Sequence, residues 1–288
     1  MNIKKYLKRV ACYLLKGLPV NHITTEIVSI APNDLLKGRK ALITGGSSGI
    51  GYAIANAFLK SGASVVITGR TEEKLIDCVN KLIISIPSAK DKISYIVMDN
   101  KDVKSFKSIF DNNIFMQDID ILVNNAGVLG GDISVATEEN YDKVLDTNLK
   151  GTFFLSKLVA QNMKDKSIKG NILNIASSSS LRPATSAYTL SKWGIRGLTL
   201  GLAKSLAPYG ITVNGLAPGP TATPMLIKGK ITEITHDNLP VGRYAMPEEI
   251  ANIAVVLTSK MGRMIVGDIV YMTGGAGIIT FDDINYCF

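Results

Sequence analysis

The chain has 288 residues, of which 46% are hydrophobic and 19% are charged, and its formal net charge is +8. This length and apolar content suit one large folded domain and exclude a chain that is disordered throughout. The three cysteines and two histidines have neither the spacing of a zinc site nor the even number of a disulfide framework. We therefore expect no metal and a reducing, cytoplasmic environment.

The first 36 residues form a basic arm that differs from the rest of the chain. Residues 1–40 hold eight of the 32 Lys and Arg residues but two of the 24 Asp and Glu residues, and so six of the eight net charges. Apolar residues recur in the arm at helical spacing, with basic residues on the opposite side. Such a helix can lie on an anionic membrane surface, or pack on its own domain or on another subunit. The remainder is nearly neutral, which gives no reason to expect nucleic-acid binding.

From Lys40 onward, short β-rich runs alternate with helical runs. The sequence predicts strands over 40–44, 63–69, 93–99, 119–125, 170–176 and 211–217. These runs are almost continuously apolar, as expected of strands that helices cover on both faces. The alternation predicts an α/β protein, with one doubly wound parallel sheet of the Rossmann type over residues 37–280. The tail 281–288 lies outside that domain.

The first predicted strand runs into the segment TGGSSGIG (residues 44–51), and a predicted helix follows. In this context Gly45 permits the tight turn, Gly49 lets the backbone approach a phosphate, and Gly51 lets the helix pack close to the sheet. The free N–H groups of the helix N-terminus attract a pyrophosphate. The turn therefore predicts a dinucleotide site. Its expected contacts are Gly45, Ser47, Ser48, Gly49, Ile50 and Gly51.

Arg70 follows the second predicted strand, 19 residues after Gly51. A carboxylate at this point would bind the ribose 2′-hydroxyl of NAD(H), whereas an arginine suits the 2′-phosphate of NADP(H). A solvated loop arginine is the alternative, so NADP(H) is the preferred cofactor and NAD(H) stays open. Asp99, at the end of the third predicted strand, is placed to meet the adenine amino group.

Four segments have the order and approximate spacing of a known family's motifs: TGGSSGIG (44–51), NNAG (124–127), YTLSK (188–192) and PGPTATPM (218–225). Together they resemble the short-chain dehydrogenase/reductase family, including its 3-oxoacyl-[acyl-carrier-protein] reductases, over roughly residues 37–279. The resemblance implies an oxidoreductase that acts on a carbonyl compound or a secondary alcohol, and Arg70 favours NADP(H) as its cofactor. It also implies a homotetramer or homodimer and a small-molecule substrate, with acyl carrier protein as an optional partner. Further implied cofactor contacts are Asn124, Ala126, Gly127, Tyr188, Lys192, Pro218, Gly219, Thr221 and Thr223.

Tyr188 and Lys192 are four residues apart, so on a helix they share a face. A free tyrosine has a pKa of about 10. A neighbouring ammonium group lowers it by stabilising the phenolate, which would suit Tyr188 to acid–base catalysis. The resemblance implies that Tyr188 protonates the carbonyl oxygen and that Lys192 holds the nicotinamide ribose. It also implies that Asn148 anchors a water in a proton relay.

Four consecutive serines complicate the choice of the catalytic serine. In the family this serine usually precedes the tyrosine by thirteen positions, which here gives Ile175, a residue without a hydroxyl. Aligning the end of the preceding strand gives Ser177 instead, with Ser178 as the alternative. We expect Ser177 to bind the substrate oxygen, and Ser179 and Ser180 to lie on the loop surface.

A second hypothesis is a non-catalytic NADP-binding sensor or scaffold whose arm binds a membrane or a partner. The complete set of Tyr188, Lys192 and Asn148 argues against it, because a sensor needs no proton-transfer residues. Residues 226–238 would form a mobile lid over the substrate. Met225 and Leu226 would line an apolar pocket there or pack on the core.

Overall fold

The computed structural model describes residues 28, 30–227, 234–236 and 239–278. The tail 281–288, most of the predicted arm and part of the predicted lid lie outside the described residues. No described helix is long and apolar enough to span a membrane.

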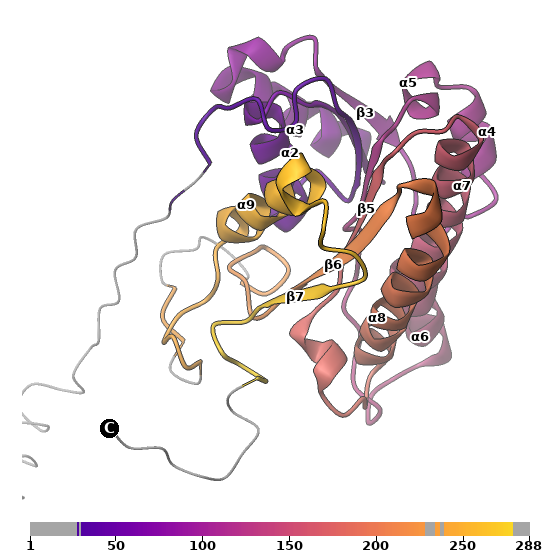
Figure 1. The fold of residues 1–288 in the computed structure, drawn as a ribbon. Helices are drawn as coiled ribbons and strands as arrows, with labels where there is room; N and C mark the ends of the chain where they lie inside the picture. The colour runs from indigo at the N-terminus through magenta and orange to yellow at the C-terminus, as the bar shows by residue number, and fades with distance from the viewer. Residues whose placement is uncertain (1–27, 29, 228–233, 237–238, 279–288) are drawn as a thin grey trace, which may run out of the picture.

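Within the described residues, seven parallel strands form one sheet in the order β3-β2-β1-β4-β5-β6-β7 (Figure 1). The strands are β1 (Lys40–Thr44), β2 (Ser64–Gly69), β3 (Ile93–Val97), β4 (Ile121–Asn124), β5 (Asn171–Ile175), β6 (Thr212–Pro218) and β7 (Ile269–Met272). The first six match the predicted strands to within two residues at each end. β7 has no counterpart among the predictions, because it is a short, half-exposed strand at the edge of the sheet.

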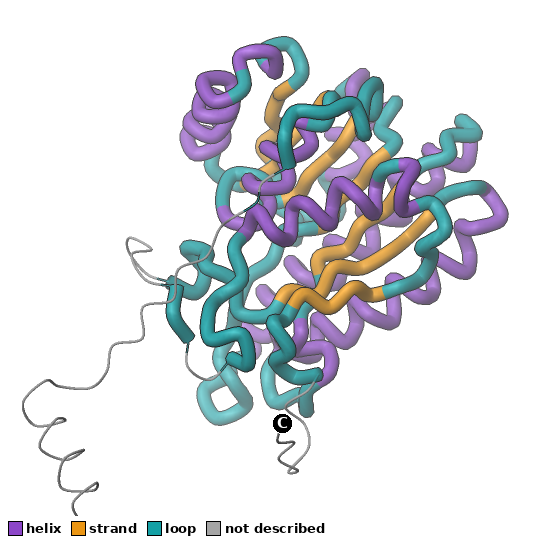
Figure 2. The backbone as a smooth tube through the Cα atoms, turned by 60° about the vertical axis from the view of Figure 1, so that its left-hand side comes forward, coloured by secondary structure: helices purple, strands orange, loops and turns teal. Residues whose placement is uncertain are grey.

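Helices cover both faces of this sheet (Figure 2), which confirms the predicted doubly wound fold. One face carries α2 (Gly49–Lys60), α3 (Glu72–Ser85) and α9 (Pro247–Thr258). The other side carries α4 (Phe106–Asp111), α5 (Ile114–Gln117), α6 (Glu138–Leu145), α7 (Gly151–Asp165) and α8 (Ala187–Leu206). Short helical turns are η1 (Pro87–Ala89), η2 (Asp146–Lys150), η3 (Ser178–Leu181), η4 (Ala207–Tyr209) and η5 (Lys260–Gly262).

Each face of the sheet has its own apolar core. Ile54 and Phe58 are one helical turn apart on α2 and are fully buried against the sheet and α9. On the opposite face, Leu155 and Val159 have the same spacing on α7 and are buried with apolar residues of α8. Apolar residues at this spacing make helices amphipathic, and burial of that stripe fixes each helix on the sheet.

The packed domain begins before residue 37. Leu36 is fully buried, and its backbone N–H donates to the Ser61 carbonyl oxygen at 2.8 Å. The Asn33 backbone N–H donates to Lys60 O at 2.9 Å, and that of Ile30 donates to Asn252 Oδ1 at 3.0 Å. The end of the predicted arm, from residue 30, therefore packs on the domain.

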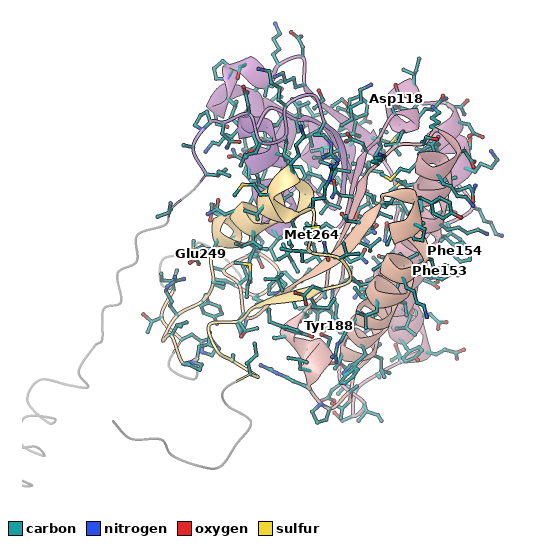
Figure 3. All side chains as sticks on the ribbon, viewed as in Figure 1. Asp118, Phe153, Phe154, Tyr188, Glu249 and Met264 are labelled. Carbon is teal, nitrogen blue, oxygen red and sulfur yellow. The ribbon has the colours of Figure 1, made fainter. Side chains whose placement is uncertain are left out.

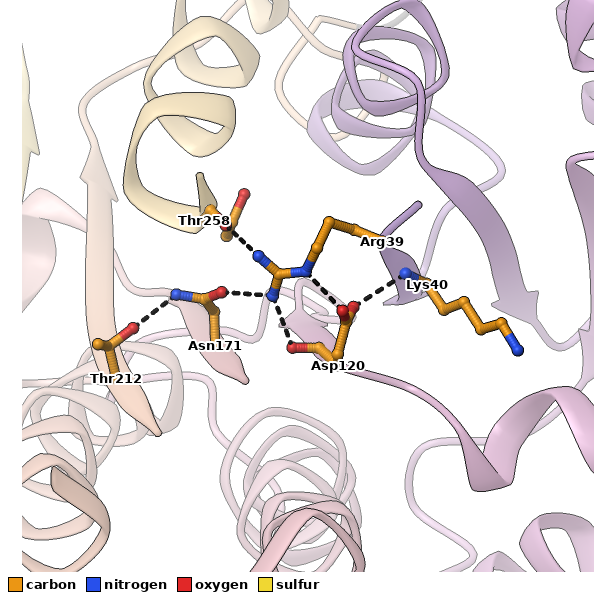
Figure 4. Close-up of polar contacts among 6 residues, drawn as sticks. All are labelled: Arg39, Lys40, Asp120, Asn171, Thr212 and Thr258. Atoms are coloured by element: carbon orange, nitrogen blue, oxygen red, sulfur yellow. Dashed lines mark hydrogen bonds and ion pairs between the residues drawn. The ribbon is translucent and has the colours of Figure 1, made fainter. Parts of the chain in front are cut away.

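Arg39 joins three strands and one helix at the amino ends of the strands (Figure 4). Its guanidinium forms an ion pair with Asp120, just before β4, and donates to Asn171 Oδ1 in β5 at 2.7 Å and to Thr258 O in α9 at 3.2 Å. The other carboxylate oxygen of Asp120 accepts from the Lys40 backbone N–H of β1 at 2.8 Å. This end of the sheet is thus occupied by structural contacts.

The strand order reverses between β1 and β4, because β2 and β3 extend to one side and β5 to β7 to the other. In open parallel sheets, ligands bind beyond the carboxyl ends of the strands at such a reversal.

Candidate active site

A cavity of about 470 Å³ lies at the carboxyl ends of the strands, where the topology predicts a ligand site. Its walls come from the glycine turn, the end of β2, the segment after β4, the loop after β5, the start of α8 and the segment after β6. Most of the predicted site residues line it. The predicted residues that do so are Gly45, Ser47, Ser48, Gly49, Ile50, Arg70, Asp99, Ala126, Gly127, Ser177, Tyr188, Lys192, Pro218, Gly219, Thr221 and Thr223.

The glycine turn has the backbone that its sequence predicts. Gly45 and Gly49 have φ values of +63° and +56°, a region that side chains other than glycine rarely adopt. A Cβ atom on Gly51 would overlap the Gly45 carbonyl oxygen, so α2 could not pack this closely with a larger residue. The turn thus leaves exposed backbone and the N-terminus of α2 facing the cavity.

Asn124 and Asn125 have different positions, and sequence reasoning selected the wrong one as a cavity residue. Asn124 points into the core, where its Nδ2 donates to Ser156 Oγ and Asn174 Oδ1, each at 2.8 Å. Asn125 lines the cavity, and its Nδ2 donates to the Thr44 and Gly45 carbonyl oxygens at 2.9 and 3.0 Å. Asn125 therefore holds the glycine turn, a role that the paired Asn-Asn sequence alone does not assign.

The end of the cavity at β2 and β3 is cationic. Arg70 and Lys74 both line it and both are exposed, whereas Asp99 is half-buried nearby. Lys74 lies in the first turns of α3 and is a second basic residue that sequence reasoning missed. Its position four residues after Arg70, across a predicted helix start, was the available signal.

Tyr188 (Figure 3) and Lys192 lie in the first two turns of α8, and Lys192 reaches the carboxyl end of β5. The Lys192 side chain is buried, and its Nζ donates to the Ile175 carbonyl oxygen at 2.7 Å. The same Nζ lies 5.6 Å from the centroid of the Tyr188 ring. The i, i+4 spacing thus brings both side chains into one cavity.

The predicted lowering of the Tyr188 pKa by Lys192 is wrong for this structure. Burial raises the pKa of Tyr188 above its ordinary value, and a hydrogen bond with the Ser177 side chain opposes this rise only in part. Burial lowers the pKa of Lys192 to about 8. Removal from water is therefore the largest cause of both pKa shifts, since it disfavours the charged phenolate and the charged ammonium alike.

The four consecutive serines have different surroundings. Ser177 is buried, its side chain bonds to that of Tyr188, and its Oγ accepts from the Ser179 N–H at 3.1 Å. Ser178 is buried at the cavity wall and Ser179 is half-buried there. The expected surface position of Ser180 is wrong: this residue is fully buried, and its Oγ donates to the Ser177 carbonyl oxygen at 2.8 Å.

Asn148 is buried in the π-helical turn η2 and is not among the cavity-lining residues. Its Oδ1 accepts from the Val128 N–H at 2.8 Å, and its Nδ2 donates to Val128 O at 3.0 Å and to Ser191 Oγ at 3.2 Å. Ser191 Oγ in turn donates to the Tyr188 carbonyl oxygen at 2.6 Å. Asn148 thus links the segment after β4 to the helical turn that carries Tyr188.

The segment after β6 closes the remaining side of the cavity. Thr221 and Thr223 are buried there, and Thr221 Oγ1 donates to the Gly219 carbonyl oxygen at 2.9 Å. Met225 and Leu226 line the cavity and are each 49% exposed, so they face the cavity mouth rather than the core.

These residues fit a nicotinamide dinucleotide. The positive φ values at Gly45 and Gly49 and the free N-terminus of α2 form a cradle for a pyrophosphate. Arg70 and Lys74 stand at one end of that cradle, and Tyr188 and Lys192 stand at the other end of the cavity.

Comparison with known proteins identifies the family. The family model described as short chain dehydrogenase matches residues 39–233. The chain is 36% identical over 251 residues to the 3-oxoacyl-[acyl-carrier-protein] reductase FabG of Rickettsia bellii, an alignment that covers 83% of this chain and 97% of that protein.

Two solved structures share the fold at lower identity. The 3-ketoacyl-(acyl-carrier-protein) reductase of Brucella melitensis, complexed with NADH, is 28% identical with a TM-score of 0.75, over 84% of this chain and 100% of that one. A short chain dehydrogenase of Burkholderia cenocepacia, in complex with NADP, is 29% identical with a TM-score of 0.73, over 83% of this chain and 98% of that one. The chain belongs to the short-chain dehydrogenase/reductase family and is an oxidoreductase enzyme.

Proposed function

We propose that the protein is an NADP-dependent reductase of a carbonyl compound, or dehydrogenase of the matching secondary alcohol, with Tyr188 as the general acid or base. The observation that carries this proposal is that Tyr188, Ser177 and Lys192 meet in the cavity whose far end is the glycine turn. The sensor hypothesis is not favoured, because relatives over nearly the full domain are named as enzymes.

The bound dinucleotide would supply or accept the hydride. During reduction, the Tyr188 hydroxyl donates its proton to the carbonyl oxygen, and the Ser177 hydroxyl hydrogen-bonds to the same oxygen. The raised pKa of Tyr188 keeps the phenol protonated at neutral pH, so its proton is available for the carbonyl oxygen. Lys192 would hold the ribose of the bound dinucleotide, and Asn148 would position the first turn of α8 and anchor the proton relay.

The preference for NADP(H) rests on Arg70 and Lys74. Two basic side chains near the end of β2 suit a 2′-phosphate, and the carboxylate typical of NAD(H) sites is replaced there by Arg70. Arg70→Gln and Lys74→Gln should each raise the KM for NADPH roughly tenfold and leave that for NADH unchanged. Lys90→Gln, an exposed lysine outside the cavity, is the matched control.

For the substrate, the FabG relatives support a small carbonyl compound, with an acyl thioester on acyl carrier protein as one option. The deciding experiment follows absorbance at 340 nm for NADPH and NADH side by side, over ketones, acyl thioesters and sugars. Oxidation of NADPH in preference to NADH supports the proposal. Tight NADPH binding without turnover of any substrate would restore the sensor hypothesis.

We also propose that the protein is a homo-oligomer of the cytoplasm. Phe153 and Phe154 on α7 are 47% and 40% exposed and point away from the sheet (Figure 3). Leu190, Trp193 and Leu200 form a similar exposed row on α8. Apolar surface of this kind marks an association site. Light scattering should give a dimer or tetramer for the wild type and a monomer for Phe153→Asp.

A further inference from the structure

At the end of the cavity remote from Arg70, Arg182 is a second basic residue in addition to Lys192. Arg182 lines the cavity from the loop after β5, together with Ser179 and Tyr188. β1 and β4 separate β2 from β5, so the strands that precede Arg70 and Arg182 are roughly 14 Å apart at the usual spacing. Arg182 therefore stands on the side of Tyr188, and the glycine turn after β1 lies between it and Arg70.

The backbone of Arg182 is fixed, whereas its side chain has no partner among the described residues. Its N–H donates to the Ser179 carbonyl oxygen at 3.1 Å, and its own carbonyl oxygen accepts from Trp193 Nε1 at 2.9 Å. Its extended conformation, with φ −98° and ψ 155°, is the one that the following Pro183 requires. The loop thus presents an unpaired, exposed guanidinium at the cavity wall.

The surroundings of Arg182 leave this charge for a ligand. Asp99 is the one carboxylate among the described residues that line the cavity, and it lies at the β3 end. The same cavity is also lined by the apolar side chains of Leu129, Met225 and Leu226. A ligand with an apolar carbon skeleton and an anionic group matches these walls.

We propose that Arg182 binds an anionic group of the substrate, a carboxylate or a phosphate, and so selects oxo acids or keto phosphates over neutral ketones. This inference rests on the proposed function, in which Tyr188 and Ser177 bind the carbonyl oxygen. A guanidinium matches either anion with two parallel hydrogen bonds. The pyrophosphate of the cofactor does not need Arg182, because the glycine turn and the N-terminus of α2 supply its donors.

The first arm of the test measures kcat/KM for NADPH oxidation with 2-, 3-, 4- and 5-oxohexanoate, each against its methyl ester. Dihydroxyacetone phosphate against dihydroxyacetone tests phosphate in place of carboxylate. We expect wild type to prefer one anion over its neutral partner. Arg182→Gln should lose roughly tenfold to hundredfold on that anion through KM and nothing on the ester. Arg182→Lys should recover part of the loss, since it keeps the charge without the fork.

The matched control is Arg263→Gln, because Arg263 is an exposed arginine that lies outside this cavity. This variant should leave the ratio of kcat/KM between each anion and its neutral partner unchanged. Equal rates for acids and esters in wild type would overturn the proposal, as would an equal loss on both in Arg182→Gln. In either case, NADPH oxidation with any of these substrates would still support the proposed reductase function.

The second arm needs no turnover. Trp193 is the single tryptophan of the chain, and its Nε1 bonds to the Arg182 carbonyl oxygen, so its fluorescence reports on this loop. We expect at least one of the anions of the first arm to change this fluorescence saturably in the NADP⁺ complex of wild type and Arg263→Gln, but not of Arg182→Gln. Such a response without catalysis would keep the anion site and refute the reductase function. The same response in Arg182→Gln would overturn the anion site.

Discussion

Removing the Asp120 carboxylate should destabilise the domain without affecting catalysis. Asp120 accepts from Arg39 Nε and from the Lys40 backbone N–H. The Arg39 and Asp120 side chains are 22% and 21% exposed. Breaking a fully buried pair costs about 3–5 kcal/mol, whereas an exposed pair contributes about 1 kcal/mol or less. Because water can reach about a fifth of each side chain, we expect Asp120→Ala to cost about 2–3 kcal/mol.

The assay is urea unfolding at one protein concentration. With a slope of about 2–3 kcal/mol per molar urea, the midpoint should fall by about 1 M. Asp77→Ala is the control, because Asp77 and Lys81 form a pair in which each side chain is 62% exposed. That variant should stay within about 0.5 kcal/mol of wild type. If both variants lower the free energy of unfolding by the same small amount, the Arg39 contacts do not stabilise the domain as inferred.

Three further predictions concern the site and the arm. The rate of ketone reduction should be independent of pH below about 8 and fall above it, because Lys192 loses its proton there while Tyr188, whose pKa is raised, keeps its own. Lys192→Arg should remove this fall, and a wild-type rate that stays constant to pH 10 would contradict the prediction. Gly151→Ala should lower the free energy of unfolding by about 1–3 kcal/mol or more, since its Cβ would overlap the Asn100 carbonyl oxygen. It should also lower kcat, because Asn100 Nδ2 donates to Thr147 O beside Asn148; an unchanged unfolding temperature and kcat would contradict both expectations. Deleting residues 1–20 should abolish sedimentation with anionic vesicles. Sedimentation that persists would exclude residues 1–20 as the membrane contact.

The fold and the glycine turn were predictable because they depend on local rules. Apolar runs covered on both faces and glycines that need positive φ leave a direct signal in the sequence. The edge strand β7 leaves a weaker signal, since it is only four residues long, with one buried and three half-buried, and so shows neither continuous burial nor alternation.

Other features of the site depend on three-dimensional neighbours. The sequence cannot show that Asn124 turns into the core while Asn125 faces the cavity, because both amides suit either position. The burial of Ser180 depends on how the loop after β5 packs near Tyr271. Likewise, i, i+4 spacing predicts that Tyr188 and Lys192 are neighbours, but their pKa values follow from burial, which only the folded chain reveals.

The proposed function depends on proton transfer by Tyr188, and the Tyr188→Phe variant removes the hydroxyl that would carry it out. The measurement is the single-turnover loss of 340 nm absorbance with saturating NADPH and the best carbonyl substrate, alongside NADPH binding to the same variant. The rate should be at least about a hundredfold lower, with NADPH affinity unchanged, because the variant lacks only the hydroxyl that donates the proton. A Tyr188→Phe variant that reduces the carbonyl at the wild-type rate would refute Tyr188 as the proton donor.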